Sequence, residues 1–132
     1  VRRYYVGGAL GVDMWAGELI LRLKEQPGYG DIELVVVLPF EGHDSKWDER
    51  SKRRMDFLLR MCSDCVVIGK EDCRENYIKR NCYMVDHADY LVAVYDNERN
   101  LRSGTMQTVR YAQNKGITIS FVNPDTATVT TN

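Results

Sequence analysis

The chain has 132 residues, of which 44% are hydrophobic and 28% are charged, and its formal net charge is −1. This length fits one domain, and this composition is that of a globular protein rather than a disordered one. The near-neutral charge excludes a global field that attracts nucleic acid or an anionic membrane. No apolar run approaches the roughly 18 residues of a membrane helix, so we expect no membrane partner.

No secretory signal is visible, and we therefore expect a cytoplasmic protein. The first residue is Val1 rather than Met, which suggests that a further piece precedes this sequence.

Strand and helix patterns alternate along the chain with short connections. In chain order we predict strand 3–6, helix 13–25, strand 33–38, helix 45–61 or 47–61, strand 65–69, helix 74–85, strand 90–95, helix 104–115 and strand 117–122. The first helix places its apolar residues on one expected core face: Val12, Trp15, Ala16, Leu19 and Leu23. Pro39 is expected to end the second strand, and Gly116 to close the last helix.

Alternation of this kind predicts an α/β fold, namely a single three-layer α/β/α domain with a mainly parallel five-stranded sheet. We assign residues 1–124 to this domain and expect residues 125–132 to be a frayed tail. Ligands of such sheets bind beyond the carboxyl ends of the strands. That rule selects a rim made of Gly7-Gly8, Pro39-Phe40, Gly69, Tyr95-Asp96 and Asn123.

The four cysteines are Cys62, Cys65, Cys73 and Cys82. A zinc site would use all four thiolates, but Cys65 opens an apolar strand and Cys82 falls on the apolar face of a helix. A redox motif of the thioredoxin kind would place the Cys-x-x-Cys pair after a strand, not between a helix and a strand. We therefore expect reduced cysteines on buried faces, with no metal and no disulfide.

The most informative stretch joins the first strand to the first helix, and it contains Gly7, Gly8, Ala9, Gly11 and Asp13. Glycines there let backbone N–H groups turn toward a ligand, and the start of a helix favours an anion such as phosphate. Asp13 is well placed to cap the helix. The spacing differs from the dinucleotide-binding fingerprint, so NAD is not indicated. A tight turn needed only for packing is the alternative.

A second turn of the same kind, Ser103-Gly104-Thr105, opens the last helix after a polar loop. Its amides and two hydroxyls could form a second phosphate cradle that faces the first. A plain helix cap is the alternative. We expect the ligand site to lie between the two turns.

Several motifs resemble those of the YpsA-like proteins. They are Gly-Gly-Ala-Leu-Gly-Val-Asp from Gly7, Trp15-Ala16-Gly17-Glu18, Leu38-Pro39-Phe40-Glu41-Gly42, Trp47 with Arg54, Arg80-Asn81 before Met84-Val85-Asp86, Ala93-Val94-Tyr95-Asp96 and Gly104-Thr105. This bacterial family belongs to the SLOG group, with DprA, the molybdenum-cofactor carrier proteins and the LOG phosphoribohydrolases. The resemblance implies a Rossmann-like fold that binds or senses a nucleotide-derived ligand and, in some Firmicutes, a link to cell division.

Two departures from the family pattern stand out. Family members usually begin with a further strand that ends in Gly-His-Arg-Pro, which the sequence from Val1 onward does not contain; if that strand is absent, we expect a gap or an open edge in the sheet. An open edge favours self-association, and we expect a homo-oligomer. The other departure is mild: Ser103 stands where the family usually has glycine.

Polar residues on the rim have two interpretations each. Arg54 coincides with a family position and has a guanidinium suited to phosphate, although the rest of its basic helix is a solvated face. Arg80 and Asn81 lie within a helix, where they either reach a ligand or bond a neighbouring loop. Asp96 is a candidate for a ribose hydroxyl or for a simple turn. His43 is expected on the surface or in a loop, because no Cys or Ser lies at a catalytic spacing from it.

We consider three functions. The first is a binding module for a small anionic, nucleotide-derived ligand, with no cofactor beyond that nucleotide or phosphate. The second is a nucleoside-monophosphate phosphoribohydrolase, but Thr108 stands where the LOG enzymes have a catalytic glutamate, and a threonine cannot stabilise an oxocarbenium charge. Glu18 remains as a substitute carboxylate. The third is an interaction protein with a vestigial site.

Overall fold

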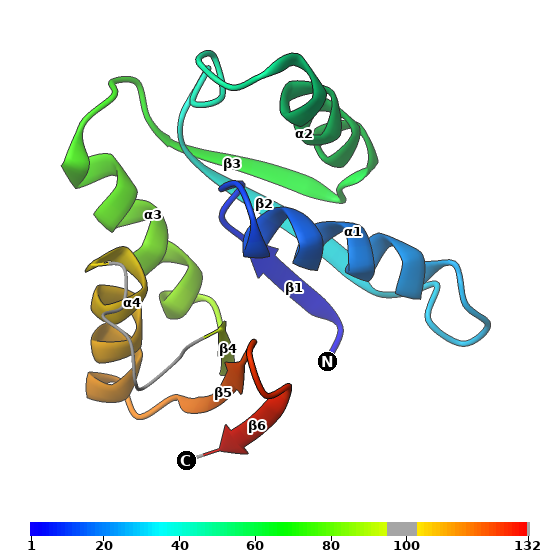
Figure 1. Cartoon of the computed structure of the whole chain (residues 1–132), viewed down its shortest axis with the longest axis vertical. Coiled ribbons are helices and arrows are strands. Elements are labelled where there is room, and N and C mark those ends of the chain that lie inside the picture. The colour runs from blue at the N-terminus through cyan, green and yellow to red at the C-terminus, as the bar shows by residue number, and fades with distance from the viewer. Residues whose placement is uncertain (95–102, 132) are drawn as a thin grey trace. The chain divides into compact units, whose positions relative to one another are not determined.

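The structure is a computed structural model, and it describes residues 1–94 and 103–131. In chain order the elements are β1 (Arg3–Val6), α1 (Val12–Lys24), β2 (Glu33–Phe40), α2 (Glu49–Met61), β3 (Asp64–Gly69), α3 (Arg74–Asp86), β4 (Tyr90–Val94), α4 (Ser103–Asn114), β5 (Thr118–Asn123) and β6 (Thr128–Thr131) (Figure 1). They form two compact units, the first of residues 1–80 and the second of residues 81–132. In the described ranges no helix is both long and apolar enough to cross a membrane.

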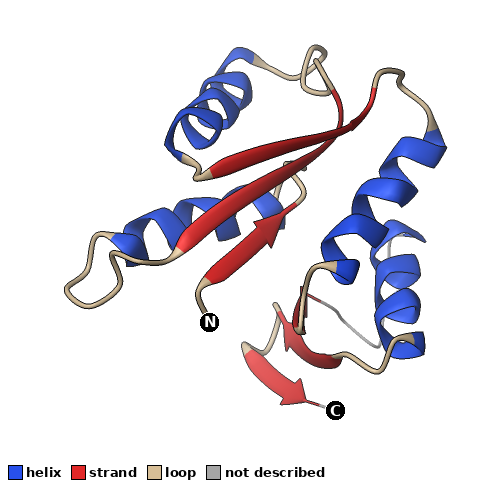
Figure 2. Cartoon of the chain, turned by 180° about the vertical axis from the view of Figure 1, so that it is seen from behind, coloured by secondary structure: helices blue, strands red, loops and turns tan. Residues whose placement is uncertain are grey.

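The first unit is built on a parallel sheet in the order β1-β2-β3. β2 lies in the middle, and its continuous apolar sequence is buried on both faces, as expected for a covered parallel strand. Leu34, Val36 and Leu38 point to one face, where α1 contributes Met14 and α2 contributes Met55 and Leu58 to the core. Figures 1 and 2 show the two helices beside the three strands from opposite directions.

The second unit has a smaller core, formed by Val85, Ala93, Val109, Ala112 and Ile119. β4 and β5 pair in parallel, whereas β5 and β6 are antiparallel. The end of α3 is tied to α4, because the carboxylate of Asp86 accepts hydrogen bonds from the hydroxyl of Tyr111 at 2.7 Å and from the ammonium of Lys115.

The α/β alternation is confirmed and is compatible with a Rossmann-like fold, but the single five-stranded sheet is not found. Among the described residues the strands form two three-stranded sheets. The expected frayed tail instead contains β6, because the side chain of Asn123 accepts the N–H groups of Asp125 and Thr126 and turns the chain back. Thr128–Thr131 then pair with β5, which suits the high strand preference of threonine and valine.

Pro39 lies inside β2 rather than after it, and its side chain is fully buried. β1 pairs with β2 only as far as Val36, so the backbone at Pro39 faces no strand on that side and loses no ladder hydrogen bond. The prediction that Pro39 ends the strand is therefore wrong.

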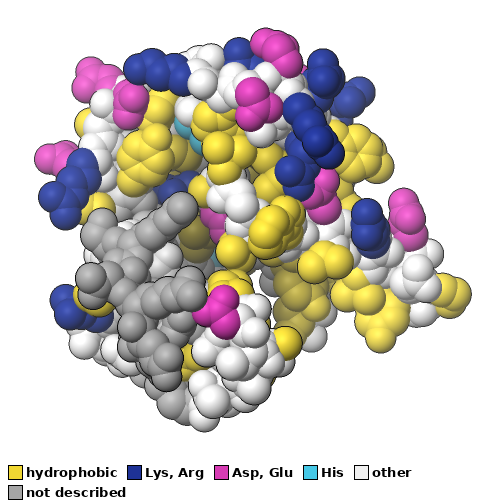
Figure 3. Space-filling view, in the orientation of Figure 1, with side chains coloured by type: hydrophobic (Ala, Val, Ile, Leu, Met, Phe, Trp, Pro, Cys, Tyr) yellow, Lys and Arg dark blue, Asp and Glu magenta, His cyan; other side chains and the backbone are white. Residues whose placement is uncertain are grey.

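The buried face of α1 also differs from the prediction. Met14 and Gly17 are fully buried, whereas Trp15 is 58% exposed and Leu19 is 61% exposed. Gly17 permits close approach to α2, since a Cβ at Gly17 would lie 3.2 Å from the methyl groups of Leu58. Hydrophobic side chains consequently remain on the surface over α1 (Figure 3).

All four cysteines are free. The expectation that they all lie on buried faces is wrong for Cys65, which is exposed on β3. No group of three or more His, Cys, Asp or Glu side chains that could hold a metal ion occurs in the described ranges.

Candidate functional site

The turn between β1 and α1 is held by contacts from distant parts of the first unit. Gly7 and Gly8 are buried, and Gly8 has a φ of 69°, in the left-handed region. A Cβ on Gly8 would lie 2.7 Å from the side chain of Leu38, so the turn lies directly on β2. Glycine is therefore required here for both its conformation and its small size.

Two carbonyl groups of this turn accept hydrogen bonds from side chains. The guanidinium of Arg80 donates to the oxygen of Gly7. His43 places its Nε2 at 2.8 Å from the oxygen of Gly8, where the ring nitrogen donates to the carbonyl. Because the C=O and N–H of one peptide unit point in opposite directions, these contacts fix which way the amides of the turn face.

Asp13 and Arg80 form a charged pair of side chains around Gly7. A Cβ on Gly7 would lie 2.8 Å from Oδ2 of Asp13 and 2.9 Å from a guanidinium nitrogen of Arg80. Burial raises the pKa of Asp13, and the charge of Arg80 and the N–H groups of Ala9 and Gly7 oppose that shift. Burial also lowers the pKa of Arg80. These two side chains support the turn from within the protein.

The first turn of α1 has no side-chain cap. Its N-cap residue is Gly11, and Asp13, the predicted cap, instead accepts the N–H of Ala9 at 3.4 Å. That prediction is wrong because the carboxylate is drawn back toward Arg80. Leu10, Gly11 and Val12 are exposed, no side chain caps the N–H groups at the helix start, and helix starts favour anions.

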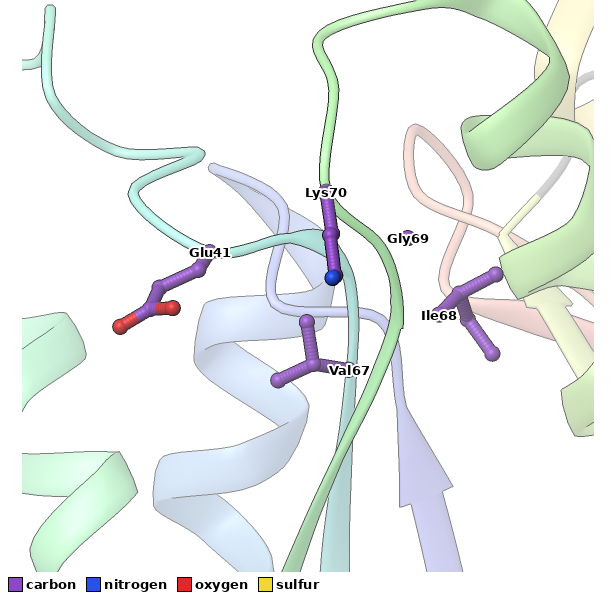
Figure 4. Close-up of a pocket in the computed structure, with 5 residues that line it drawn as sticks. All are labelled: Glu41, Val67, Ile68, Gly69 and Lys70. Atoms are coloured by element: carbon purple, nitrogen blue, oxygen red, sulfur yellow. The ribbon is translucent and has the colours of Figure 1, made fainter.

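A pocket of about 520 Å³ opens at the carboxyl ends of β2 and β3 (Figure 4). It is lined by Glu41, Val67, Ile68, Gly69 and Lys70. The chain after β3 is fixed by Asn76, which is buried against Gly69 and donates from its side-chain amide to the carbonyl of Glu71 at 2.7 Å. Asn76 therefore holds the segment around Gly69 and Glu71, which includes part of the pocket lining.

Arg54 pairs with Glu18 of α1, with Nε at 3.3 Å from Oε2. The pair joins α1 to α2 and occupies both side chains. Arg54 is one of the predicted phosphate ligands, and Glu18 is the carboxylate considered as a substitute catalytic group. Pro39 is also unavailable to a ligand, because its side chain is fully buried.

Other predicted site residues belong to the second unit. Asn81 lies on α3, partly buried, and Ser103, Gly104 and Thr105 begin α4, with Gly104 exposed. Thr108 donates its hydroxyl to the carbonyl of Gly104 at 2.9 Å. Convergence of this helix start with the glycine turn stays a prediction, and Asp96 lies outside the described residues.

Sequence reasoning missed three residues near the turn: His43, Glu41 and Lys70. His43 was expected on the surface or in a loop; it lies in the turn after β2, partly buried, and packs edge-on against Trp47, with ring centroids 5.2 Å apart. Glu41 and Lys70 follow the ends of β2 and β3. The rule that selected the rim by strand ends would have found both, had it been extended by one residue at each strand.

Comparison with known proteins gives one consistent result. A model of the YpsA proteins, described as the YspA SLOG family, matches residues 1–127. UPF0398 proteins of Bacillus cereus strain B4264 and Bacillus thuringiensis strain Al Hakam are each 29% identical over 96 residues, which is 71% of this chain and 51% of the relative. One from Staphylococcus epidermidis strain RP62A is 25% identical over 96 residues, covering 71% of this chain and 50% of the relative. The chain spans about half the length of the curated relatives it matches.

Proposed function

The chain belongs to the YspA SLOG family, and from this premise we propose that it binds a small anionic, nucleotide-derived ligand at the turn between β1 and α1. The observation that carries the proposal is the uncapped, exposed start of α1. Asp13 and Arg80 hold the turn from inside, and this leaves the outward N–H groups for an anion. The pocket beyond β2 and β3 supplies room for the rest of the ligand.

The proposal keeps Gly7, Gly8, Ala9, Gly11 and Asp13 as the residues of the turn. The start of α4, with Ser103, Gly104 and Thr105, is proposed as a second phosphate contact. Asn81 and Asp96 also stay proposed ligand contacts. Asn81 is proposed from its position within a helix, and Asp96 from its position after a predicted strand. A cytoplasmic location and self-association of the chain are part of this proposal.

The test places a carboxylate where the anion would bind. Val12 is 42% exposed at the first position of α1, so Val12→Asp adds a negative charge that also suits the helix dipole. We expect thermal stability to stay the same or rise, while calorimetry shows at least tenfold weaker binding of the nucleotide or phosphate that wild type binds. Phe57→Asp, at an exposed position of α2, is the matched control.

Equal binding by Val12→Asp and wild type would place the ligand elsewhere. No binding by wild type to inorganic phosphate or to any of a panel of nucleoside mono- and diphosphates would contradict the proposed function itself.

A further inference from the structure

Two side chains of opposite charge, Glu41 and Lys70, line the pocket at the ends of β2 and β3. Neither belongs to the contacts described above that hold the glycine turn. Phe40 pairs with Gly69 in the sheet register, so Glu41 and Lys70 are the next residues on adjacent strands. Neighbouring strands lie about 4.8 Å apart, so the two residues start from adjacent points of the backbone at the rim of the pocket. Figure 4 shows both among the residues that line the pocket.

Neither charge is neutralised by an ion pair within residues 1–94 and 103–131. This distinguishes them from Arg54, which pairs with Glu18, and from Arg80, which donates to Gly7. Glu41 and Lys70 are both exposed at the pocket, so their charges are available to a ligand.

Two contacts tie the glycine turn to residues that neighbour the pocket in the sheet or in the chain. The side chain of Leu38 reaches toward Gly8, and Leu38 pairs in the sheet with Val67, which lines the pocket. His43 contacts the oxygen of Gly8 and lies only two residues after Glu41, a span of at most about 7 Å between Cα atoms. A molecule held at the turn can therefore extend into the pocket.

The chemistry of the pocket fits a sugar. In dinucleotide-binding parallel α/β sheets, an acidic residue beyond the strand next to the glycine-turn strand accepts a hydrogen bond from a ribose hydroxyl. Glu41 occupies that place, since β2 is the neighbour of β1 and Glu41 follows its last residue. A carboxylate close to a phosphate needs a nearby cation to offset the repulsion, and Lys70 supplies one.

We infer that this pocket is the pentose subsite of the proposed ligand, with the vicinal hydroxyls of a ribose on Glu41 and the adjoining phosphate beside Lys70. The inference rests on the proposed function. It also assigns the ribose contact to Glu41, whereas the sequence had suggested Asp96.

The experiment compares four ribonucleoside 5′-monophosphates with their 2′-deoxy counterparts by calorimetry. We expect wild type to bind the better ribonucleotide about tenfold more tightly than its deoxy form, the effect of one hydrogen bond to a charged group. Glu41→Gln should lower this preference below about threefold. Lys70→Met should weaken both forms about equally, because a cation beside phosphate does not read the 2′-hydroxyl. Glu71→Gln, an exposed carboxylate in the next loop, is the control and should behave as wild type.

Each outcome decides the matter. Equal binding of ribo- and deoxynucleotides by wild type overturns the pentose subsite and leaves the proposed function standing. A ribose preference that survives in Glu41→Gln overturns the assignment of Glu41. If wild type binds none of the eight compounds and no phosphate, the proposed function fails, and the subsite fails with it.

Discussion

The guanidinium of Arg80 donates a hydrogen bond to the carbonyl oxygen of Gly7, which lies 73 residues earlier in the chain. Arg80 is only 7% exposed, and its guanidinium and the carboxylate of Asp13 both lie beside the Cβ position of the same glycine. This contact closes the turn that the proposed ligand would use, so the stability of the first unit and the shape of the site depend on the same side chain.

Replacement of Arg80 by methionine should be strongly destabilising. It leaves the buried carboxylate of Asp13 without its cation, and the loss of one partner of a buried pair costs about 3–5 kcal/mol. Urea denaturation measures the change. Arg80→Met combined with Asp13→Asn should recover part of the loss, because the uncompensated charge is then removed. Arg53→Met, at an exposed position of α2, is the control. A double variant no more stable than Arg80→Met would contradict the pairing.

The pKa of Asp13 predicts a specific dependence of stability on pH. Burial raises this pKa above its ordinary value of 3.8, so the folded protein holds the proton more tightly than the unfolded chain does. Lowering the pH from about 7 toward about 4 therefore favours the folded state at this residue. We expect the free energy of unfolding of wild type, minus that of Asp13→Asn, to increase over this range. Denaturation curves at several pH values provide the measurement, and a decrease would mean that Arg80 outweighs burial.

Gly8 and Gly11 offer a matched pair of substitutions. Both have positive φ, 69° and 84°, but a Cβ on Gly11 meets no heavy atom within 4 Å, whereas one on Gly8 overlaps Leu38. Gly11→Ala should cost about 1–2 kcal/mol for the left-handed backbone alone. Gly8→Ala should cost roughly 1–3 kcal/mol more, because the core must also shift. Equal costs in thermal denaturation would show that the turn does not lie against β2 as described.

The substitution Arg54→Met tests whether Arg54 only joins α1 to α2 or also contacts the ligand. The pair with Glu18 is partly exposed, so its loss should reduce stability only slightly. We expect phosphate affinity measured by calorimetry to remain unchanged. Lys52→Met, another basic residue on the same helix, is the control. A large loss of affinity in Arg54→Met alone would return this residue to the ligand site.

The exposed apolar surface of α1 is the place where self-association can be tested. Trp15 and Leu19 are both more than half exposed. Leu19→Glu should shift the chain toward monomer in sedimentation experiments, since burial of apolar surface drives association. Phe57→Glu, an exposed aromatic residue of α2, serves as the comparison. A wild-type chain that is monomeric at all concentrations would contradict the proposed homo-oligomer.

Local patterns predicted most of the helices and strands, because β-branched runs such as Glu33–Phe40 and the glycine breaks are visible over a few residues. The buried face of α1 could not be chosen this way. Apolar residues occur all around that helix, and only tertiary packing selected Met14 rather than Trp15. The tail was mispredicted for a different reason, since its pairing depends on the side chain of Asn123.

The same limit applies to the candidate site. The glycine turn was recognised from the sequence because its residues are contiguous. The contacts that hold it are not: His43 lies 35 residues from Gly8, and Arg80 lies 73 residues from Gly7. Arg80 was predicted as a ligand contact from its position in a helix, whereas the structure shows that its guanidinium supports the turn. No local pattern distinguishes these two roles.

The packing of His43 against Trp47 gives the protein an optical reporter close to the turn. The chain has only two tryptophans, and Trp15 is the exposed one. In a Trp15→Phe background, emission would come from Trp47 alone, whose indole touches the same imidazole that holds the carbonyl of Gly8. Any movement of the turn that alters this imidazole also alters the surroundings of the indole. Occupancy of the site could then be followed by fluorescence in solution, without a label and without knowledge of which compound is bound.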